Sequence, residues 1–421
     1  MNNTKYSNFY FINLVVSSII PFLIWGPFLP DLIVSVLALW FLFYSFKNKK
    51  FYFFKNKPLI IFFIFCIYCI LVSIFIAKNK LLSFESSLFY FRIGIFSCFV
   101  WYLIERDKSF LSYIYYVLVI CFTSLVIDGY VQYFVGENIF GLKLYGSRIS
   151  SFFGDEAIMG SYLSRLFPLL FALFLVKKKQ KLEIYFIGIL FILTDLLIFM
   201  SGERTAFFFL NLSSLFIIIL IKNYQLFRLL TLMIASILIF ILSQNNYDLK
   251  NRMFSEPFKD MGVIKSSSTE TSTAVIFTST HDKLIRTAYK MFEDKPLFGH
   301  GPKMFRVICK DKKYATETVI CATHPHNFYI QLLAETGVVG FLFLLTAFFY
   351  VIYSALRQLK SIIFRKKRPF TDYQVCLLAG LLITVWPLSP NGNFFNNWLM
   401  IVYSLPIGFY LQSIFTKKNI L

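Results

Sequence analysis

The residues best suited to chemistry gather in one polar stretch between two long apolar regions. All four histidines of the chain fall within residues 245–326: His281, His300, His324 and His326. An imidazole is the side chain that most readily accepts a proton near neutral pH. Because Pro325 pre-sets a first helical turn, His326 is expected just inside a helix start, with Thr323 or His324 as the cap. We predict that His326 is a catalytic base.

The helix that follows His326 carries two glycines at helical spacing. With 3.6 residues per turn, one face is predicted to hold His326, Ile330, Leu333, Gly337 and Gly340. Small residues let neighbouring helices approach closely in membranes. Gly337 and Gly340 are therefore expected to be helix-packing residues beneath the histidine.

Several arginines lie either within apolar runs, where a charge is costly, or at the predicted outer surface. Arg204 and Arg286 are predicted to act with His326, because a guanidinium fork matches phosphate oxygens with two parallel hydrogen bonds. The predicted substrate-binding residues are Arg92, Arg148, Arg165, His324 and Asn327. Charges within apolar runs are expensive and often functional. The alternative for these arginines is structural pairing with Asp128, Asp195 or Glu203.

The sequence predicts no metal and no cofactor. His324 and His326 stand two residues apart and would not face the same way on a helix. The chain has no Gly-x-Ser-x-Gly elbow, no phosphate-binding loop and no dinucleotide fingerprint. A base with arginines at a membrane surface suits transfer of a group from a pyrophosphate leaving group to a hydroxyl.

The composition is that of a polytopic membrane protein. The chain is 57% hydrophobic and 20% aromatic, with a mean hydropathy of +0.66. We predict an all-α bundle of about twelve transmembrane helices, near residues 8–26, 30–46, 58–77, 85–104, 110–134, 157–176, 183–200, 204–221, 226–244, 327–356, 373–388 and 396–415. The organisation is then 1–244 with nine helices, 245–326 as one large loop, and 327–421 with three helices.

The basic residues predict the orientation of this bundle. Lysine and arginine clusters follow the second, sixth and tenth runs and close the chain, near residues 47–57, 177–181, 357–368 and 417–418. Because cytoplasmic loops carry this excess, both termini are predicted to be cytoplasmic and the histidine loop to lie outside. The net charge of +20 thus indicates topology and contact with anionic membrane lipid, and no nucleic acid is expected as a partner.

The large loop is expected to make short helices on the membrane-embedded body, without a core of its own. Cys309 and Cys321 both lie in it, and a disulfide between them is compatible with a location outside the cytoplasm. The other cysteines lie in apolar runs and are expected to be small core residues.

Three motifs resemble the O-antigen ligase family, in the superfamily that also contains O-antigen polymerases. The first is His326-Asn327, nine residues, then Gly337-Val338-Val339-Gly340. The second is its lead-in, Arg286 followed by Pro296-Leu297-Phe298-Gly299-His300-Gly301-Pro302, and the third is Ser201-Gly202-Glu203-Arg204-Thr205-Ala206. The number of spans and the large loop between the ninth and tenth also resemble the family, whereas the N-terminal third resembles it only in hydropathy.

The resemblance implies a multi-span, GT-C-like glycosyltransferase of the bacterial inner membrane with a periplasmic active site. Its donor would be an undecaprenyl-diphosphate-linked glycan and its acceptor a sugar hydroxyl of lipid A-core, without a metal. It also implies that His326 activates the acceptor while Arg204 and Arg286 hold the diphosphate. Two alternatives stay open at this point: an O-antigen polymerase, and a non-enzymatic flippase or other transporter of lipid-linked sugar.

Overall fold

The computed structural model describes residues 3–144, 146, 148–260, 278–315 and 321–416. Its α-helices are α1 (Asn3–Ser17), α2 (Ile19–Trp25), α3 (Phe28–Lys47), α4 (Lys57–Phe75), α5 (Lys80–Leu88), α6 (Arg92–Arg106), α7 (Ser109–Val135), α8 (Met159–Val176), α9 (Lys181–Met200), α10 (Arg204–Leu220), α11 (Gln225–Asn245), α12 (Tyr247–Lys250), α13 (Glu256–Asp260), α14 (Ser279–Asp294), α15 (Phe305–Ile308), α16 (Phe328–Ile363), α17 (Asp372–Thr384) and α18 (Asn397–Phe415). These residues contain no β-strand, only isolated bridge residues such as the pair Glu137 and Lys143. The all-α fold predicted from the sequence is confirmed.

The apolar helices lie where the sequence predicts them. In the described part of the chain, nine helices are long and apolar enough to cross a membrane. Three shorter apolar helices, Tyr10–Trp25, Arg204–Leu220 and Asp372–Thr384, occupy the remaining predicted runs. The protein is therefore a polytopic membrane helix bundle, while twelve crossings and the sidedness of the loop remain predictions.

Asparagine side chains begin several of these helices. Asn56, Asn79, Asn246 and Asn396 each accept a hydrogen bond from the backbone N–H three residues later, as an N-cap does. Each such bond satisfies one of the backbone donors that a helix start leaves without an intrahelical partner. These helix starts are thus set by local sequence.

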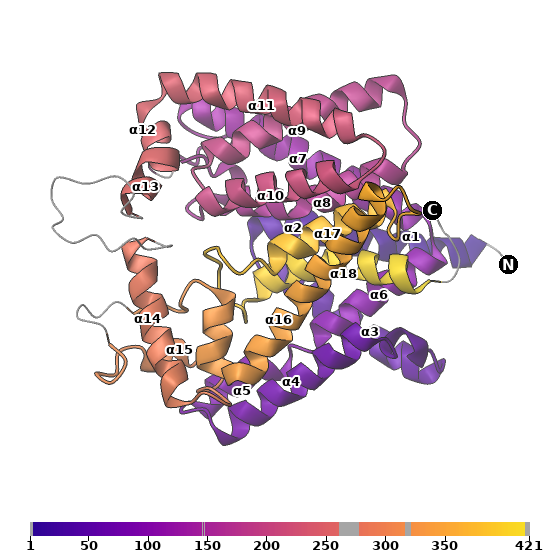
Figure 1. The fold of residues 1–421 in the computed structure, drawn as a ribbon. Helices are drawn as coiled ribbons and strands as arrows, with labels where there is room; N and C mark the ends of the chain where they lie inside the picture. Colours follow the sequence, from indigo (N-terminus) through magenta and orange to yellow (C-terminus); the bar gives the residue numbers. More distant parts are fainter. Residues whose placement is uncertain (1–2, 145, 147, 261–277, 316–320, 417–421) are drawn as a thin grey trace.

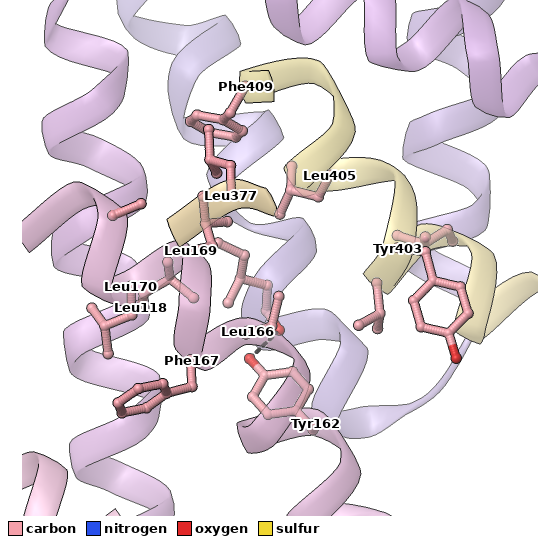
Figure 2. Close-up of a cluster of buried hydrophobic side chains, with 14 of the residues drawn as sticks. Leu118, Tyr162, Leu166, Phe167, Leu169, Leu170, Leu377, Tyr403, Leu405 and Phe409 are labelled. Carbon is pink, nitrogen blue, oxygen red and sulfur yellow. Dashed lines mark hydrogen bonds between the residues drawn. The ribbon is translucent and has the colours of Figure 1, made fainter. Parts of the chain in front are cut away.

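Helix α8 lies at the centre of the bundle. In its apolar stretch 83% of the residues are buried within the protein, against 28% for α3 and for α11, which expose large apolar side chains as lipid-facing helices do. Leu166, Phe167 and Leu169 of α8 pack among side chains of α7, α17 and α18 (Figure 2). The central helix is therefore packed on several sides, and this packing fixes the positions of the side chains on its first turns.

The long helices run side by side, with the polar helices α12 to α15 gathered at one end of the bundle (Figure 1). The start of α1 and the end of α18 lie toward the opposite end (Figure 1). This arrangement agrees with a loop and termini on different sides of a membrane.

Helix α16 differs from the prediction in two respects. Asn327 is its N-cap, accepting from the backbone of Tyr329 (3.0 Å) and Ile330 (3.2 Å), so the proposed cap at Thr323 or His324 is wrong. His326 precedes the helix with a left-handed φ of 57°. A short polar side chain that accepts two backbone bonds makes the better cap, and it leaves His326 outside the helix.

The second difference is a break at Gly337, whose φ of 62° and ψ of −164° interrupt the helix. The segment Pro296–Gly301 docks at this break, with Val338 N donating to Pro296 O (2.9 Å) and His300 N to Ala334 O (3.0 Å). A Cβ on Gly337 would lie 2.2 Å from Leu297 O. The prediction that His326, Gly337 and Gly340 share one continuous helix face is therefore wrong, and Gly337 packs against loop backbone. Gly340 packs tightly on Thr336 and near the Phe65 ring of α4.

The large loop has a small core, contrary to the prediction. Buried apolar side chains of α14 and α15 meet the first half of α16: Leu284, Ala288, Met291, Phe305, Ile308, Cys309, Tyr314 and Ala334. Cys309 and Cys321 form a disulfide beside it. The amphipathic α14 supplies an apolar face that the sequence prediction overlooked, and α16 covers it. Residues 261–277 of the loop lie outside the described residues.

The buried acids of the spans mostly serve structure. Asp195 pairs with Arg228 through two bonds (2.7 and 3.2 Å), and both side chains are fully buried. Asp128 accepts from Ser151 Oγ (2.6 Å) and Asn138 Nδ2 (3.2 Å), which fixes the loop before α8. The predicted pairing of charges within the membrane therefore occurs, with Arg228 as a partner that the sequence prediction did not name.

Candidate active site

One large cavity, of about 960 Å³, opens where the helices meet the large loop. Its walls come from five connections: α2 to α3, α7 to α8, α9 to α10, α11 to α16, and α17 to α18. The basic clusters of the sequence assign all five to the same outer side. The geometry and the charge pattern thus point to one face of the membrane.

The cavity is strongly cationic. Six arginine and lysine side chains line it: Arg148, Arg165, Arg204, Arg252, Lys303 and Arg306. Three histidines join them, His281, His324 and His326, whereas only two carboxylates line the same wall, Glu156 and Glu203. Glu203 is occupied, since it accepts from Gly160 N (2.6 Å) and Ser161 N (3.0 Å) at the start of α8. A cavity with this balance favours an anionic ligand of several charges.

His326 is held by its backbone, and its ring belongs to a group of three imidazoles. Its carbonyl accepts from Asn391 N (2.8 Å). Its ring lies 4.1 Å from the ring of His324 and 5.1 Å from that of His281, measured between centroids. Among the described residues no hydrogen bond to the ring is present, so the ring can face a substrate hydroxyl.

Burial keeps these imidazoles neutral. Burial, and then the nearby His281, lower the pKa of His326 to about 4. Burial, and then His326, lower the pKa of His324 to about 3. The pKa of His281 is lowered by burial and by the charge of Arg204. A neutral imidazole can accept a proton, so His326 is in the protonation state that a base needs.

Arg165 is the most deeply buried cation of the cavity. It lies on α8 with its guanidinium between the rings of Phe209 (4.8 Å) and Tyr403 (4.6 Å). Its Nη2 donates to Asn391 Oδ1 (3.1 Å), while Nε and Nη1 have no hydrogen-bond partner among the described residues. The sequence left open a pairing of Arg165 with an acid, and the described residues contain no such ion pair.

Arg204 begins α10 at the cavity wall. Its Nε donates to Arg252 O (2.8 Å), and its Nη2 pairs with Glu256 of α13. Arg148 approaches the same wall, with Nε donating to Ser201 O (3.0 Å) and Nη2 to Ala157 O (3.2 Å). These two predicted arginines, like Arg165, thus line the same cavity as His326, and each is anchored to loop backbone.

Three predicted site residues lie elsewhere. Arg286 is not part of the cavity wall: its side chain is 62% exposed and pairs with Asp282 one turn earlier in α14. Arg92 pairs with Asp31 and lines a smaller neighbouring hollow. Asn327 is 3% exposed and serves as the cap of α16, with its amide donating to Pro387 O (2.8 Å). Arg92 thus has a structural ion pair, with Asp31 in place of the acids named from the sequence, and Asn327 has a structural role as a helix cap.

Several residues of the cavity wall are not predicted from the sequence. Arg252, Lys303 and Arg306 lie in the large loop outside the three motifs, and His281 has no predicted role beyond being a histidine of that loop. The α17–α18 loop (residues 385–396) contains no predicted site residue, although Asn391 and Asn393 lie in the wall. Its run Ser389-Pro390-Asn391-Gly392-Asn393, polar between two apolar helices on the histidine side, was the available signal.

The cavity combines an excess of cationic side chains with a neutral imidazole. Among the described residues, no three His, Cys, Asp or Glu side chains are placed so that they could together hold a metal ion. The arrangement can bind a group with several negative charges and take a proton from a hydroxyl placed beside it.

Residues 187–345 match the O-antigen ligase family. The resemblance drawn from the motifs is thereby confirmed over α9 to the first part of α16, which includes Arg204, Arg286 and His326. The match to the O-antigen ligase family indicates an integral membrane enzyme of the ligase or polymerase type. Arg165 and Asn391, in contrast, lie outside the matched segment. No curated protein is significantly similar to the chain.

Proposed function

We propose that the protein is an O-antigen ligase of the bacterial inner membrane. It transfers a glycan from undecaprenyl diphosphate to a sugar hydroxyl of lipid A-core on the periplasmic side. The observation that carries the proposal is the cationic cavity in which Arg165, Arg204 and His326 meet. A diphosphate with an attached sugar needs this kind of site, and the family match independently indicates this class of reaction.

The proposed step needs only side chains that line the cavity. His326 takes the proton of the acceptor hydroxyl as its oxygen bonds to the anomeric carbon of the donor sugar. The bond from that carbon to the diphosphate breaks, and its electron pair leaves with undecaprenyl diphosphate. Arg165 and Arg204 stabilise the charge that develops on the leaving group. General base catalysis of this kind contributes about 10²–10⁴-fold.

Burial of Arg165 strengthens its part in this scheme. A guanidinium between two aromatic rings is removed from water, so its attraction for an anion in the cavity is screened less than at a surface. Because Nε and Nη1 have no partner among the described residues, and no acid there pairs with the side chain, its positive charge is available to the donor. In this proposal Arg165 supplies the buried cation, whereas Arg286 does not line the cavity in this structure.

Deletion of the gene in its native host tests both the reaction and the acceptor. We expect bare lipid A-core together with accumulated long undecaprenyl-linked glycan, and expect a plasmid copy to restore transfer whereas the His326→Ala form does not. Core carrying a single repeat unit would identify the protein as the polymerase. Unchanged lipopolysaccharide and unchanged lipid-linked glycan would contradict both activities.

A further inference from the structure

The α17–α18 loop is hydrogen-bonded along the start of α16. Gln331 Nε2 donates to Asn393 Oδ1 (2.9 Å), and Phe394 N donates back to Gln331 Oε1 (2.9 Å). Asn327 adds its bond to Pro387 O (2.8 Å). These contacts fix the loop against the helix that follows His326, so it is a built part of the cavity wall.

Asn391 stands at the point of this loop where the proposed anion site and the proposed base meet. Its backbone N–H donates to His326 O (2.8 Å), and its side-chain Oδ1 accepts from Arg165 Nη2 (3.1 Å). The residue is 6% exposed. A single buried residue therefore contacts both the buried cation and the backbone of the histidine.

His326 needs such a restraint because its backbone is strained. A φ of 57° lies in the left-handed region, which is unfavourable for a residue with a Cβ. Such a conformation persists only where surrounding contacts enforce it. The bond from Asn391 N to His326 O is one of those contacts, and the Asn391 side chain is held in turn by Arg165 and by a longer bond to Ser389 O (3.4 Å).

We infer that Asn391 is a positioning residue that couples the donor site to the base. The inference rests on the proposed function. With Oδ1 of Asn391 fixed on Arg165, the loop holds the His326 carbonyl, and thereby the imidazole, at a set distance from the anion. Catalytic rates are sensitive to this geometry, since a misplacement of about 1 Å can cost about 10²-fold.

The test compares two substitutions of Asn391 in the purified full-length protein, assayed with an undecaprenyl-diphosphate-linked glycan and lipid A-core. Asn391→Ala removes the side-chain link, so kcat should fall by about 10²-fold, whereas the donor KM should change little because Arg165 and Arg204 remain. Asn391→Asp keeps an oxygen for Arg165, so kcat should be largely restored. Its added negative charge should raise the donor KM. A merely structural residue would not separate kcat from KM in this way.

Coupling to Arg165 gives the second readout. Arg165→Gln combined with Asn391→Ala should lose little more kcat than the worse single variant, because both changes break the same link. The matched control is Asn48→Ala, at an exposed asparagine whose side chain donates to Tyr44 O of α3 (2.8 Å), and it should retain full activity.

Three outcomes separate this inference from the proposed function. Wild-type kinetics for Asn391→Ala, in a protein that His326→Ala inactivates, would overturn the role of Asn391 alone. Additive losses in the double variant, or an Asn391→Asp form as slow as Asn391→Ala, would also overturn it. No transfer by the wild-type protein would instead count against the proposed function. Thermal unfolding of each variant in detergent identifies losses that come from misfolding.

Discussion

At the scale of single residues, the protein combines a neutral imidazole, that of His326, with a buried cation, Arg165. No acid among the described residues pairs with Arg165. His326 and Arg165 reach the cavity from different parts of the chain, and each is held by Asn391. Burial in a cationic cavity lowers the pKa of His326, so its imidazole is neutral and can accept a proton. The proposed base is thus neutral in the same environment that would attract the proposed donor.

The pH dependence of transfer follows from the low pKa of His326, about 4 against an ordinary value near 6.5. A lowered pKa means that the neutral, proton-accepting form persists as pH falls below 6.5 and is lost only near pH 4. We therefore expect kcat/KM, which reports the free enzyme, to stay nearly constant from pH 8 to about pH 5. His281 and His324 face the ring and titrate lower than usual as well. An acid limb at pH 6.5 or above, with the fold intact by thermal unfolding, would contradict this assignment.

Substitution of Arg204 tests the anion site. Arg204→Lys keeps the charge but loses the fork, so transfer should fall by about 10²–10³-fold while abundance in the membrane is unchanged. Near wild-type activity would mean that Arg204 has a structural role, as in its contacts with Glu256 and the Arg252 backbone.

Arg286 offers the comparison. The resemblance predicts a similar loss for Arg286→Lys. Since the side chain is exposed and paired with Asp282 in this structure, a large loss would require that donor binding draws the start of α14 toward the cavity, where His281 of the same helix already lies. The chain thus provides two motif arginines, Arg204 in the cavity wall and Arg286 outside it.

At the scale of elements, the break in α16 organises the outer end of the bundle. The backbone of the docked segment Pro296–Gly301 contacts the backbone of α16 at the break at Gly337. Gly299 has a φ of 67°, and a Cβ added to it would lie 2.4 Å from the carbonyl carbon of Glu335. Two glycines with left-handed φ therefore permit a contact that side chains would prevent. This contact connects α14 and α15 to the helix that follows His326.

Substituting Gly337 should be far more damaging than substituting a left-handed glycine that borders open space. Gly337→Ala combines a φ of 62° with a clash against Leu297 backbone, so we expect loss of folded protein, measured as abundance and thermal unfolding in detergent. Gly136 has a φ of 91°, and a Cβ added there would have nothing within 4 Å, so Gly136→Ala should cost only about 1 kcal/mol. Equal effects of the two changes would show that the docked segment does not stabilise the fold.

At the scale of the whole molecule, the bundle presents its large cavity on one side. The residues of the cavity come from connections that the positive-inside rule places together, and the basic clusters lie at the other ends of the same helices. An enzyme that uses lipid-linked sugars on the outer leaflet needs this separation. The disulfide between Cys309 and Cys321 agrees with an oxidising location for the loop.

The orientation is tested with a membrane-impermeant thiol reagent on spheroplasts. The free cysteines of the described chain are all buried, so background labelling should be low. A cysteine replacing exposed Lys312 should be labelled, and one replacing exposed Lys366 should be labelled only after permeabilisation. Labelling of the Lys366 site alone in intact spheroplasts would invert the topology and place the cavity in the cytoplasm.

The sequence by itself determined the class of protein, the positions of the apolar helices and the family motifs. Hydropathy over a span and charge in a short loop are local properties, because each residue meets the membrane independently of distant partners. The candidate roles of His326 and Arg204 were also accessible, since their motifs lie within single short segments, and the structure brings both to one cavity.

Only the tertiary structure decided which charges meet. Arg165 lies far along the chain from Asn391, and no local pattern indicates their hydrogen bond. Arg286 and Asn327 have the residue types of a binding site, yet one is exposed beside Asp282 and the other caps a helix. The break at Gly337 depends on a loop docking from outside the helix. Several residues of the same type could form each contact as far as the sequence shows. Long-range packing determines which of them do, and therefore which residues form the site.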